Sequence, residues 1–422
     1  MVRRAAFATL ACALAACTLF TPLDHLTGGE AGADAADGPT PPQDGQPDSP
    51  ADAGEATTMD SPVMDVASVA CDVGTACGTR CVDTQKDPSS CGRCGHDCGG
   101  GMCTSGVCQP VVLAMGLNGP RALYVSGGNV YWTDHSSSGD VASCPVTGCT
   151  GAPQTYATGL SYASGISVSA GSIFFGCYGG TDPDGGAANI DSAMYACSTS
   201  GCGMTPSSLT NTPGAPVGVA SDGTSVFWND PAYGQILSCA VGGCGGTPTV
   251  VAHNIGTPWY ALATDSSNVY FAGRGDGTVY SCPKAGCGSN LPTTIVTGLT
   301  GPYALAVDTD TVYVTTYDPN NMGTPAPVVS CPLAGCAMPT VVAANQATPS
   351  GIAADGNGVY WANESSATPG ASTVAYCPKS GCPQGPTILA SSQQGAFFVA
   401  LDASFVYWTD YVAGQVLRVA KP

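Results

Sequence analysis

The apolar residues of this chain recur as a short motif in which a β-branched residue precedes two large apolar ones. No stretch of useful length shows the 3.6-residue period of an amphipathic helix. Each copy is flanked by further short apolar stretches and by turns rich in Gly, Pro and Asp, as expected for four antiparallel strands per repeat. The seven copies, 43 to 53 residues apart, are Val130-Tyr131-Trp132, Ile173-Phe174-Phe175, Val226-Phe227-Trp228, Val269-Tyr270-Phe271, Val312-Tyr313-Val314, Val359-Tyr360-Trp361 and Val406-Tyr407-Trp408.

The two ends of the repeat array predict how it closes. The last copy stops after its third strand, residues 415–419, while an additional strand, residues 111–114, precedes the first copy. Pairing these two segments would complete the last blade and remove exposed sheet edges. We therefore predict an all-β fold, a seven-bladed β-propeller over residues 110–422 that is closed by an N-terminal outer strand.

Positions in the repeat suggest where a ligand would bind. The residue ten before the middle anchor residue should open the innermost strand and line the rim of the central channel. With Trp259 beside them, these residues are Arg121, Ser164, Val217, Tyr260, Tyr303, Ser350 and Phe397. One cation among aromatic rings suits an acidic or aromatic ligand, or a loop of a partner protein. The candidate ligand-binding residues are thus Arg121, Trp259, Tyr260, Tyr303 and Phe397, and the alternative is that these rings simply fill the axis.

Two copies carry a longer motif. Tyr131-Trp132-Thr133-Asp134 and Tyr407-Trp408-Thr409-Asp410 resemble the YWTD repeats of lipoprotein-receptor propellers. The resemblance covers a short motif and implies a propeller. That family has six blades, so the seven copies here depart from it.

Cysteine pairs recur with the repeat. Six pairs share the pattern C-x-x-x-G-C, which can bring the ends of a hairpin within disulfide distance. Disulfides imply an oxidising compartment; repeated zinc or redox sites are the alternative, but no His recurs with the pairs. Cys177 is left over and is expected to be a buried thiol. The pairs are Cys144 and Cys149, Cys197 and Cys202, Cys239 and Cys244, Cys282 and Cys287, Cys331 and Cys336, and Cys377 and Cys382.

Eight more cysteines fall within residues 71–109, a segment too short to build its own apolar core. We predict a disulfide-rich module and leave its connectivity open, since eight cysteines allow about 105 pairings. Zinc is the alternative, because Cys91, Cys94, His96 and Cys98 have ligand-like spacing. His96 is expected to be a solvated loop residue. The eight are Cys71, Cys77, Cys81, Cys91, Cys94, Cys98, Cys103 and Cys108.

The N-terminal sequence predicts the cellular location. Residues 1–16 combine a basic start with a short apolar run, as in a signal peptide. The run ends in Leu14-Ala15-Ala16-Cys17, which resembles the lipobox of bacterial lipoproteins and implies lipidation of Cys17. Residues 17–70 are rich in Ala, Gly, Pro and Asp, and we expect a disordered linker. We therefore expect a lipid-anchored protein of the cell envelope, at the outer membrane or the cell surface.

The net charge of −19 argues against nucleic acid as a partner. Asp182, Asp184 and Asp191 offer oxygen ligands for Ca²⁺ without the spacing of an EF-hand loop, and no other cofactor is expected. We interpret the propeller as a binding, adhesion or scaffold module for a protein or glycan ligand, more than as an enzyme. The alternative is a hydrolase or lyase with its site at the channel mouth, although the aligned inner positions hold no carboxylate, Asn or His for a catalytic metal.

Overall fold

The computed structural model describes residues 70–179, 192–210, 214–318, 324–365, 368 and 370–422. The predicted signal peptide, Cys17, the linker up to residue 69 and the calcium candidates Asp182, Asp184 and Asp191 lie outside the described residues. Within the described part, no helix is long and apolar enough to cross a membrane. The fold there is almost entirely β-structure, with one 3-10 turn, η1 (Gly288–Asn290).

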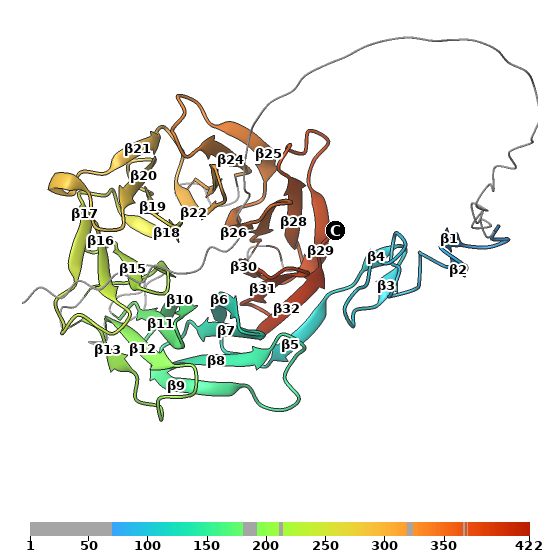
Figure 1. The fold of residues 1–422 in the computed structure, drawn as a ribbon, viewed down its shortest axis with the longest axis horizontal. Helices are drawn as coiled ribbons and strands as arrows, with labels where there is room; N and C mark the ends of the chain where they lie inside the picture. The colour runs from blue at the N-terminus through green and yellow to red at the C-terminus, as the bar shows by residue number, and fades with distance from the viewer. Residues whose placement is uncertain (1–69, 180–191, 211–213, 319–323, 366–367, 369) are drawn as a thin grey trace, which may run out of the picture. The chain divides into compact units, whose positions relative to one another are not determined.

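Seven four-stranded antiparallel sheets form the ring in Figure 1, which confirms the predicted seven-bladed propeller. Blades 1 to 3 are β6 (Pro120–Ser126), β7 (Asn129–Asp134), β8 (Gly139–Pro145) and β9 (Gln154–Leu160); β10 (Ala163–Ser169), β11 (Ser172–Cys177), β12 (Ala193–Ser198) and β13 (Ser207–Ser208); and β14 (Val219–Ser221), β15 (Ser225–Asp230), β16 (Gln235–Ala240) and β17 (Thr249–His253). Blades 4 and 5 are β18 (Pro258–Thr264), β19 (Asn268–Gly273), β20 (Thr278–Pro283) and β21 (Thr293–Val296); and β22 (Pro302–Val307), β23 (Thr311–Thr316), β24 (Ala326–Pro332) and β25 (Thr340–Gln346). Blades 6 and 7 are β26 (Pro349–Ala354), β27 (Gly358–Asn363), β28 (Ser372–Pro378) and β29 (Thr387–Gln393); and β30 (Ala396–Leu401), β31 (Phe405–Asp410), β32 (Gln415–Ala420) and β5 (Val111–Met115).

Blade 7 closes the ring as predicted. Its outer strand β5 pairs antiparallel with β32, so that Val111 lies opposite Arg418 and Met115 opposite Gln415. In every blade the innermost strand runs from one face, which we call the entry face, to the other, which we call the hairpin face. The turns between first and second strands and the cysteine hairpins between third and fourth strands both lie at the hairpin face, because successive strands alternate in direction.

The anchor residues form the core between blades. The indole rings of Trp132, Trp228, Trp361 and Trp408 are at most 2% exposed. Side chains at the axis must be small, because the innermost strands approach one another closely there. A Cβ on Gly165 would lie 2.3 Å from the carbonyl oxygen of Val217 in the next blade. The aspartates five residues before the anchors cap turns, as Asp402 shows by accepting hydrogen bonds of 2.7 Å from both Ser404 and Phe405 N–H.

The structure also explains the motif that resembles YWTD. The hydroxyl of Thr133 donates to the carbonyl of Ser164 in blade 2 at 2.6 Å, and that of Thr409 donates to the carbonyl of Arg121 in blade 1 at 2.7 Å. The final aspartate of the second copy, Asp410, accepts from the N–H of Gln394 at 2.8 Å, where the chain enters the blade. The motif therefore joins neighbouring innermost strands and fixes the connection between blades.

All six predicted hairpin pairs are joined as disulfides, with Cα–Cα distances of 5.1 to 5.8 Å. Three of these hairpins donate a hydrogen bond to the outer strand of the preceding blade. The N–H of Cys149 donates to Leu113 in β5, that of Cys287 to Val251 in β17 and that of Cys336 to Ile295 in β21, at 3.0 to 3.1 Å. The disulfides thus stiffen contacts between blades as well as single hairpins.

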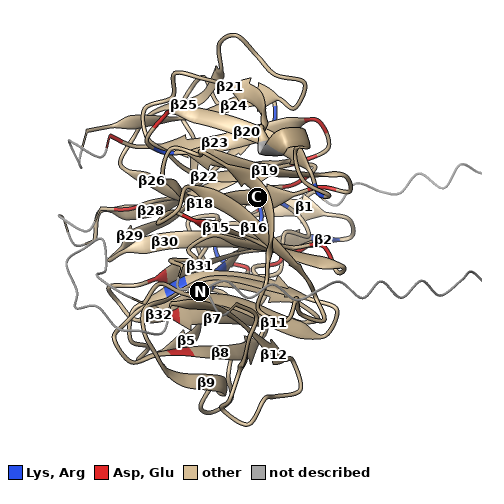
Figure 2. Cartoon of the chain, turned by 90° about the vertical axis from the view of Figure 1, so that its left-hand side faces the viewer, with Lys and Arg blue, Asp and Glu red and all other residues tan. Residues whose placement is uncertain are grey.

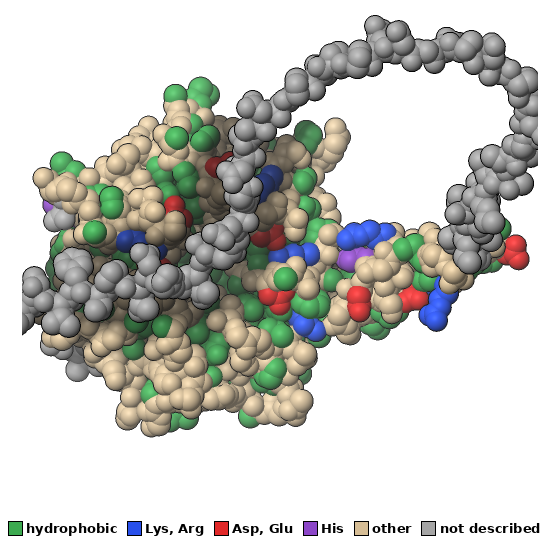
Figure 3. All heavy atoms as spheres, in the orientation of Figure 1, with side chains coloured by type: hydrophobic (Ala, Val, Ile, Leu, Met, Phe, Trp, Pro, Cys, Tyr) green, Lys and Arg blue, Asp and Glu red, His purple; other side chains and the backbone are tan. Residues whose placement is uncertain are grey.

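Three ion pairs on the hairpin face also join each blade involved to the preceding one. Lys284 pairs with Asp222 at 2.7 Å, Lys379 with Asp308 at 2.5 Å and Lys421 with Asp355 at 2.6 Å. In each pair the lysine reaches the turn aspartate of the preceding blade, and Figure 3 shows cationic and acidic side chains side by side around the middle of the ring. Burial disfavours ionisation of Asp308, but Lys379 and the turn N–H groups outweigh it and lower the pKa of that carboxyl.

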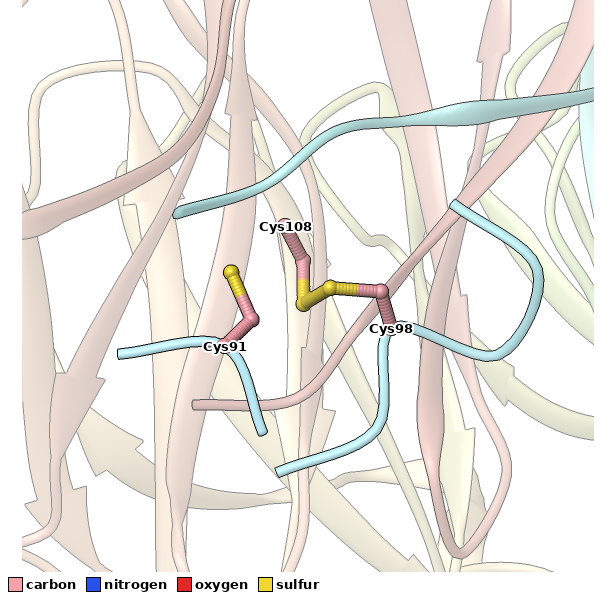
Figure 4. Close-up of side chains that lie close together, drawn as sticks. All are labelled: Cys91, Cys98 and Cys108. Carbon is pink, nitrogen blue, oxygen red and sulfur yellow. A yellow bond between two sulfur atoms is a disulfide. The ribbon is translucent and has the colours of Figure 1, made fainter. Parts of the chain in front are cut away.

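The cysteine-rich module contains two small hairpins, β1 (Thr75–Cys77) with β2 (Arg80–Val82) and β3 (Cys103–Thr104) with β4 (Val107–Cys108). Its disulfides join Cys71 to Cys81, Cys77 to Cys94, Cys91 to Cys103 and Cys98 to Cys108. The sulfurs of Cys91, Cys98 and Cys108 lie within 4.8 Å of one another, and Figure 4 shows the Cys98–Cys108 bond beside Cys91. This cluster is the contact between two disulfides, and the oxidised module retains no thiolate among these eight residues for the alternative zinc site.

The module is fastened to blade 7. The guanidinium of Arg418 donates to the carbonyl of Gly99 at 2.7 Å and stacks 4.1 Å from the ring centre of Phe405. The expectation that His96 is a solvated loop residue is wrong, since it is half-buried with Nε2 2.9 Å from the carbonyl oxygen of Lys421. In blade 7 the third strand β32 pairs with β5, and four module cysteines join the core cluster of blades 6 and 7.

Candidate functional site

Four of the predicted rim residues converge on the axis at the entry face. The guanidinium carbon of Arg121 lies 4.8 Å from the ring centre of Phe397 and 5.5 Å from that of Tyr260. The Tyr260 and Tyr303 rings are 5.6 Å apart. They meet because each opens its innermost strand, where seven strands crowd around one axis. The sequence therefore predicted this inner ring of residues correctly as a spatial group.

The remaining rim positions do not contribute to this group in the same way. The hydroxyl of Ser164 donates to the carbonyl of Pro216 at 2.6 Å, and that of Ser350 donates to the carbonyl of Phe397 at 2.8 Å. Both serines therefore link neighbouring blades instead of facing the channel mouth. Val217 is buried in the same core cluster as the aromatic rings.

A second cation, Arg274, was not predicted for this site. Its guanidinium carbon lies 4.6 Å from the ring centre of Tyr317 and 5.6 Å from that of Trp259, and it hydrogen-bonds the Tyr317 hydroxyl. Arg274 stands four residues after its anchor aromatic, where the chain leaves the second strand at the entry face. The same repeat position holds His135, Tyr178, Pro231, Tyr317, Glu364 and Tyr411. Aligning the repeats at this position would have found the residue.

These residues form an outer ring that contacts the inner one. Ring centres are 6.2 Å apart for Tyr178 and Trp259, 5.4 Å for Tyr317 and Tyr303, and 5.6 Å for Tyr411 and Phe397. The Tyr411 hydroxyl donates to Glu364 at 2.8 Å. We call the two rings together the aromatic–arginine surface: Arg121, Tyr178, Trp259, Tyr260, Arg274, Tyr303, Tyr317, Glu364, Phe397 and Tyr411.

Exposure differs between the two rings. Trp259, Tyr260, Tyr303 and Phe397 are at most 8% exposed. Both arginines and the outer tyrosines are half-buried. The alternative that the predicted aromatics fill the axis therefore describes the inner rings well, while a ligand would meet the arginines and the outer ring.

The surface gathers positive charge in an acidic protein. The propeller segment from residue 111 onward has six cationic and sixteen acidic side chains, and Figure 2 marks Lys and Arg in blue and Asp and Glu in red. Three lysines pair with turn aspartates on the hairpin face and Arg418 holds the module. The other two, Arg121 and Arg274, both lie here. A guanidinium that stacks on a ring still offers in-plane N–H groups, which suit a carboxylate or another oxyanion.

Burial also sets the protonation of the groups around Arg121. It raises the pKa of the Tyr303 phenol well above its ordinary value, so this hydroxyl stays protonated. Burial, with the nearby charge of Arg121 as the second cause, lowers the pKa of His135 to about 3. The His135 ring packs 5.2 Å from Tyr162, and its Nδ1 lies 3.0 Å from the carbonyl oxygen of Ala163. The imidazole is thus neutral at physiological pH.

The depressed pKa of His135 gives a stability prediction. Between its folded pKa of about 3 and its ordinary value of 6.5, the unfolded chain binds the extra proton and the folded chain does not. Stability therefore falls as pH drops through this window. Replacing His135 with Gln should reduce the slope of the unfolding free energy against pH by up to about 1.4 kcal/mol per pH unit. Urea titrations at pH 4 to 7 test this, and an unchanged slope would contradict it.

Comparison with known proteins identifies the fold. No protein-family model and no curated protein sequence matches the chain. Among solved structures, virginiamycin B lyase from Staphylococcus aureus is 13% identical with a TM-score of 0.57, over 74% of this chain and 99% of that chain. A catalytically inactive variant of that lyase with quinupristin gives 12% and 0.55 over the same shares, and a streptogramin B lyase gives 13% and 0.55 over 74% and 96%. At such low identity, these likenesses show that the chain shares the propeller fold of these lyases.

Proposed function

We propose that this protein is a lipid-anchored binding module of the cell envelope and that it holds its ligand on the aromatic–arginine surface. The observation that carries the proposal is the pairing of two guanidiniums with aromatic rings in one cluster at the entry face. Stacked rings with a few placed charged groups are typical of binding sites. The ligand would be a protein or glycan that presents an acidic or aromatic group.

The expected cellular location supports this role. The signal peptide and the lipobox-like Cys17 favour a lipid anchor, and ten disulfides suit an oxidising compartment. The module leads into β5, which starts at the hairpin face because it runs antiparallel to β32. The chain therefore joins the propeller at the face opposite to the aromatic–arginine surface, which leaves that surface available to a partner.

A binding screen with matched variants tests the proposal. The secreted-side protein, residues 18–422, would be applied to arrays of cell-envelope glycans and proteins. Replacing both Arg121 and Arg274 with Gln should weaken binding of the ligands found by about tenfold or more, because each charge-assisted hydrogen bond is worth about 1.5–3 kcal/mol. Arg80→Gln, on the exposed face of the module, is the matched control. Ligands that bind the double variant as tightly as the parent would rule out this surface.

The alternative function is a lyase or hydrolase with its site at the entry-face mouth of the channel. The propeller fold that the chain shares with streptogramin lyases motivates this alternative. His135 is the candidate general acid or base at this mouth. Its pKa of about 3, however, makes the imidazole a weak base at neutral pH. Incubation with quinupristin, followed by liquid chromatography and tandem mass spectrometry, tests this alternative directly, because these separate the substrate from an isomeric product as well as from a hydrolysed one. A product that forms with the parent protein and not with His135→Gln would favour the enzyme over the binding module.

A further inference from the structure

The axis contains a cavity below the aromatic–arginine surface. Its volume is about 350 Å³, and innermost strands from all seven blades line it. Residues that line it include Tyr124, Ile166, Val219, Leu262, Leu305 and Ala400. The described lining contains no Asp, Glu, Lys, Arg or His. Its side chains are aliphatic or aromatic, while backbone groups and tyrosines contribute polar surface to the wall.

One residue closes the cavity toward the entry face. Nine residues before the anchor aromatic, six blades have a small side chain, namely Ala122, Gly165, Gly218, Ala261, Ala304 and Gly351. Blade 7 has Phe398 at this position, and its ring centre lies 5.2 Å from that of Tyr260. Phe398 also packs against three separate core clusters around the axis. Phe398 and Tyr260 therefore divide the axis, and the cavity is blind at its upper end.

Exposure shows where the cavity opens. Ala122, Tyr260 and Ala304, toward the entry end of their strands, are at most 6% exposed. Val125 and Leu401, at the other end of the innermost strands, are half-buried. Because these strands end at the hairpin face, the cavity is entered from that face.

The turns around this opening carry more acidic than basic side chains. The turns at the ends of the innermost strands carry five aspartates, three of which pair with lysines. The other two, Asp265 and Asp402, each accept a hydrogen bond of 2.6 Å from a tyrosine hydroxyl. Lys284 also lies near Asp265, and Lys421 donates to the backbone carbonyl of Asp402. Five carboxylates against three ammonium groups leave the opening negative, in a chain of net charge −19.

We propose that this blind axial cavity binds a small apolar molecule that is neutral or cationic. An apolar cavity of about 150 Å³ takes a benzene ring, so a fused two-ring molecule is a suitable size here. The charged opening would admit an ammonium group on such a molecule and repel a carboxylate. The site lies on the face opposite to the aromatic–arginine surface, and it does not depend on the function proposed above.

Three naphthalene derivatives with one ring system and different charge test the proposal. We expect 2-naphthylmethanol and 2-naphthylmethylammonium to bind the full secreted-side protein, and 2-naphthoate to bind at least about tenfold more weakly. Isothermal titration and ligand-detected NMR measure the three affinities. Equal affinity of all three compounds would contradict the proposed selection by charge, and no binding of the neutral one up to its solubility would show that the cavity is only a water-filled vestibule.

A pocket-filling variant locates the binding. Ala400 lines the cavity two residues after Phe398, on the same side of β30, since side chains alternate along a strand. Ala400→Phe should fill the space and weaken naphthylmethanol binding about tenfold or more. Ala344→Phe makes the same change at an exposed position of β25 and should leave the affinity unchanged. If the variants behave alike, or if Ala400→Phe retains full affinity in a folded protein, the proposed site is wrong.

Discussion

Replacing Leu113 with Asp is expected to open the propeller ring and to lower the free energy of unfolding by about 4 kcal/mol or more. Leu113 is 3% exposed and packs in a core cluster with Val130, Trp132 and Tyr407. Its carbonyl also accepts the N–H of Cys149 from blade 1. A carboxylate here would be buried without a cation, so β5 should leave the sheet. Blade 7 would then keep three strands and an exposed edge.

The neighbouring residue provides the control. Val112 belongs to the same strand but is 44% exposed, and Val112→Asp should change the free energy of unfolding by no more than about 0.5 kcal/mol. Urea unfolding measures both variants, and limited proteolysis should cut Leu113→Asp near β5. Equal destabilisation by both substitutions would mean that β5 is not held by its buried side.

The sequence was sufficient to predict the blades, their number and their closure. This succeeded because propeller repeats are periodic: one anchor position fixes the phase of every strand, and an incomplete last unit requires a strand from elsewhere. The same phase placed Arg121, Tyr260, Tyr303 and Phe397 at one end of the axis, and the structure brings them together.

Contacts between blades outside the inner ring were not predicted. Arg274 and Tyr317 follow their anchors into loops of different length, so their proximity in space is not visible from a single repeat. The C-x-x-x-G-C pattern indicates a local ring, but only the fold shows Cys287 bonded to Val251 of the preceding blade. The pairing of the eight module cysteines likewise needs the three-dimensional arrangement, because their spacing permits many combinations.

Reduction of the disulfides is also expected to lower the free energy of unfolding strongly. Each hairpin disulfide spans a sequence separation of 5 and should contribute about 2 kcal/mol by restricting the unfolded chain. Six such contributions are on the order of 12 kcal/mol, which is comparable to the whole stability of a typical domain, about 5–15 kcal/mol. We therefore expect the fully reduced protein to unfold at 37 °C without denaturant. Circular dichroism with and without reductant measures this, and a reduced protein with an unchanged melting temperature would contradict it.

A single pair shows whether the hairpins act between blades. Replacing Cys282 and Cys287 with Ser should cost about 2 kcal/mol and should loosen the contact of this hairpin with Val251 in the preceding blade. Hydrogen exchange should then accelerate in β17 of blade 3 as well as in β20 and β21 of blade 4, since local opening follows lost contacts. Faster exchange confined to blade 4 would show that the disulfide stabilises only its own hairpin. Faster exchange in both blades would instead mean that each cysteine hairpin stabilises the contact with the preceding blade, and that these hairpins together hold the ring closed.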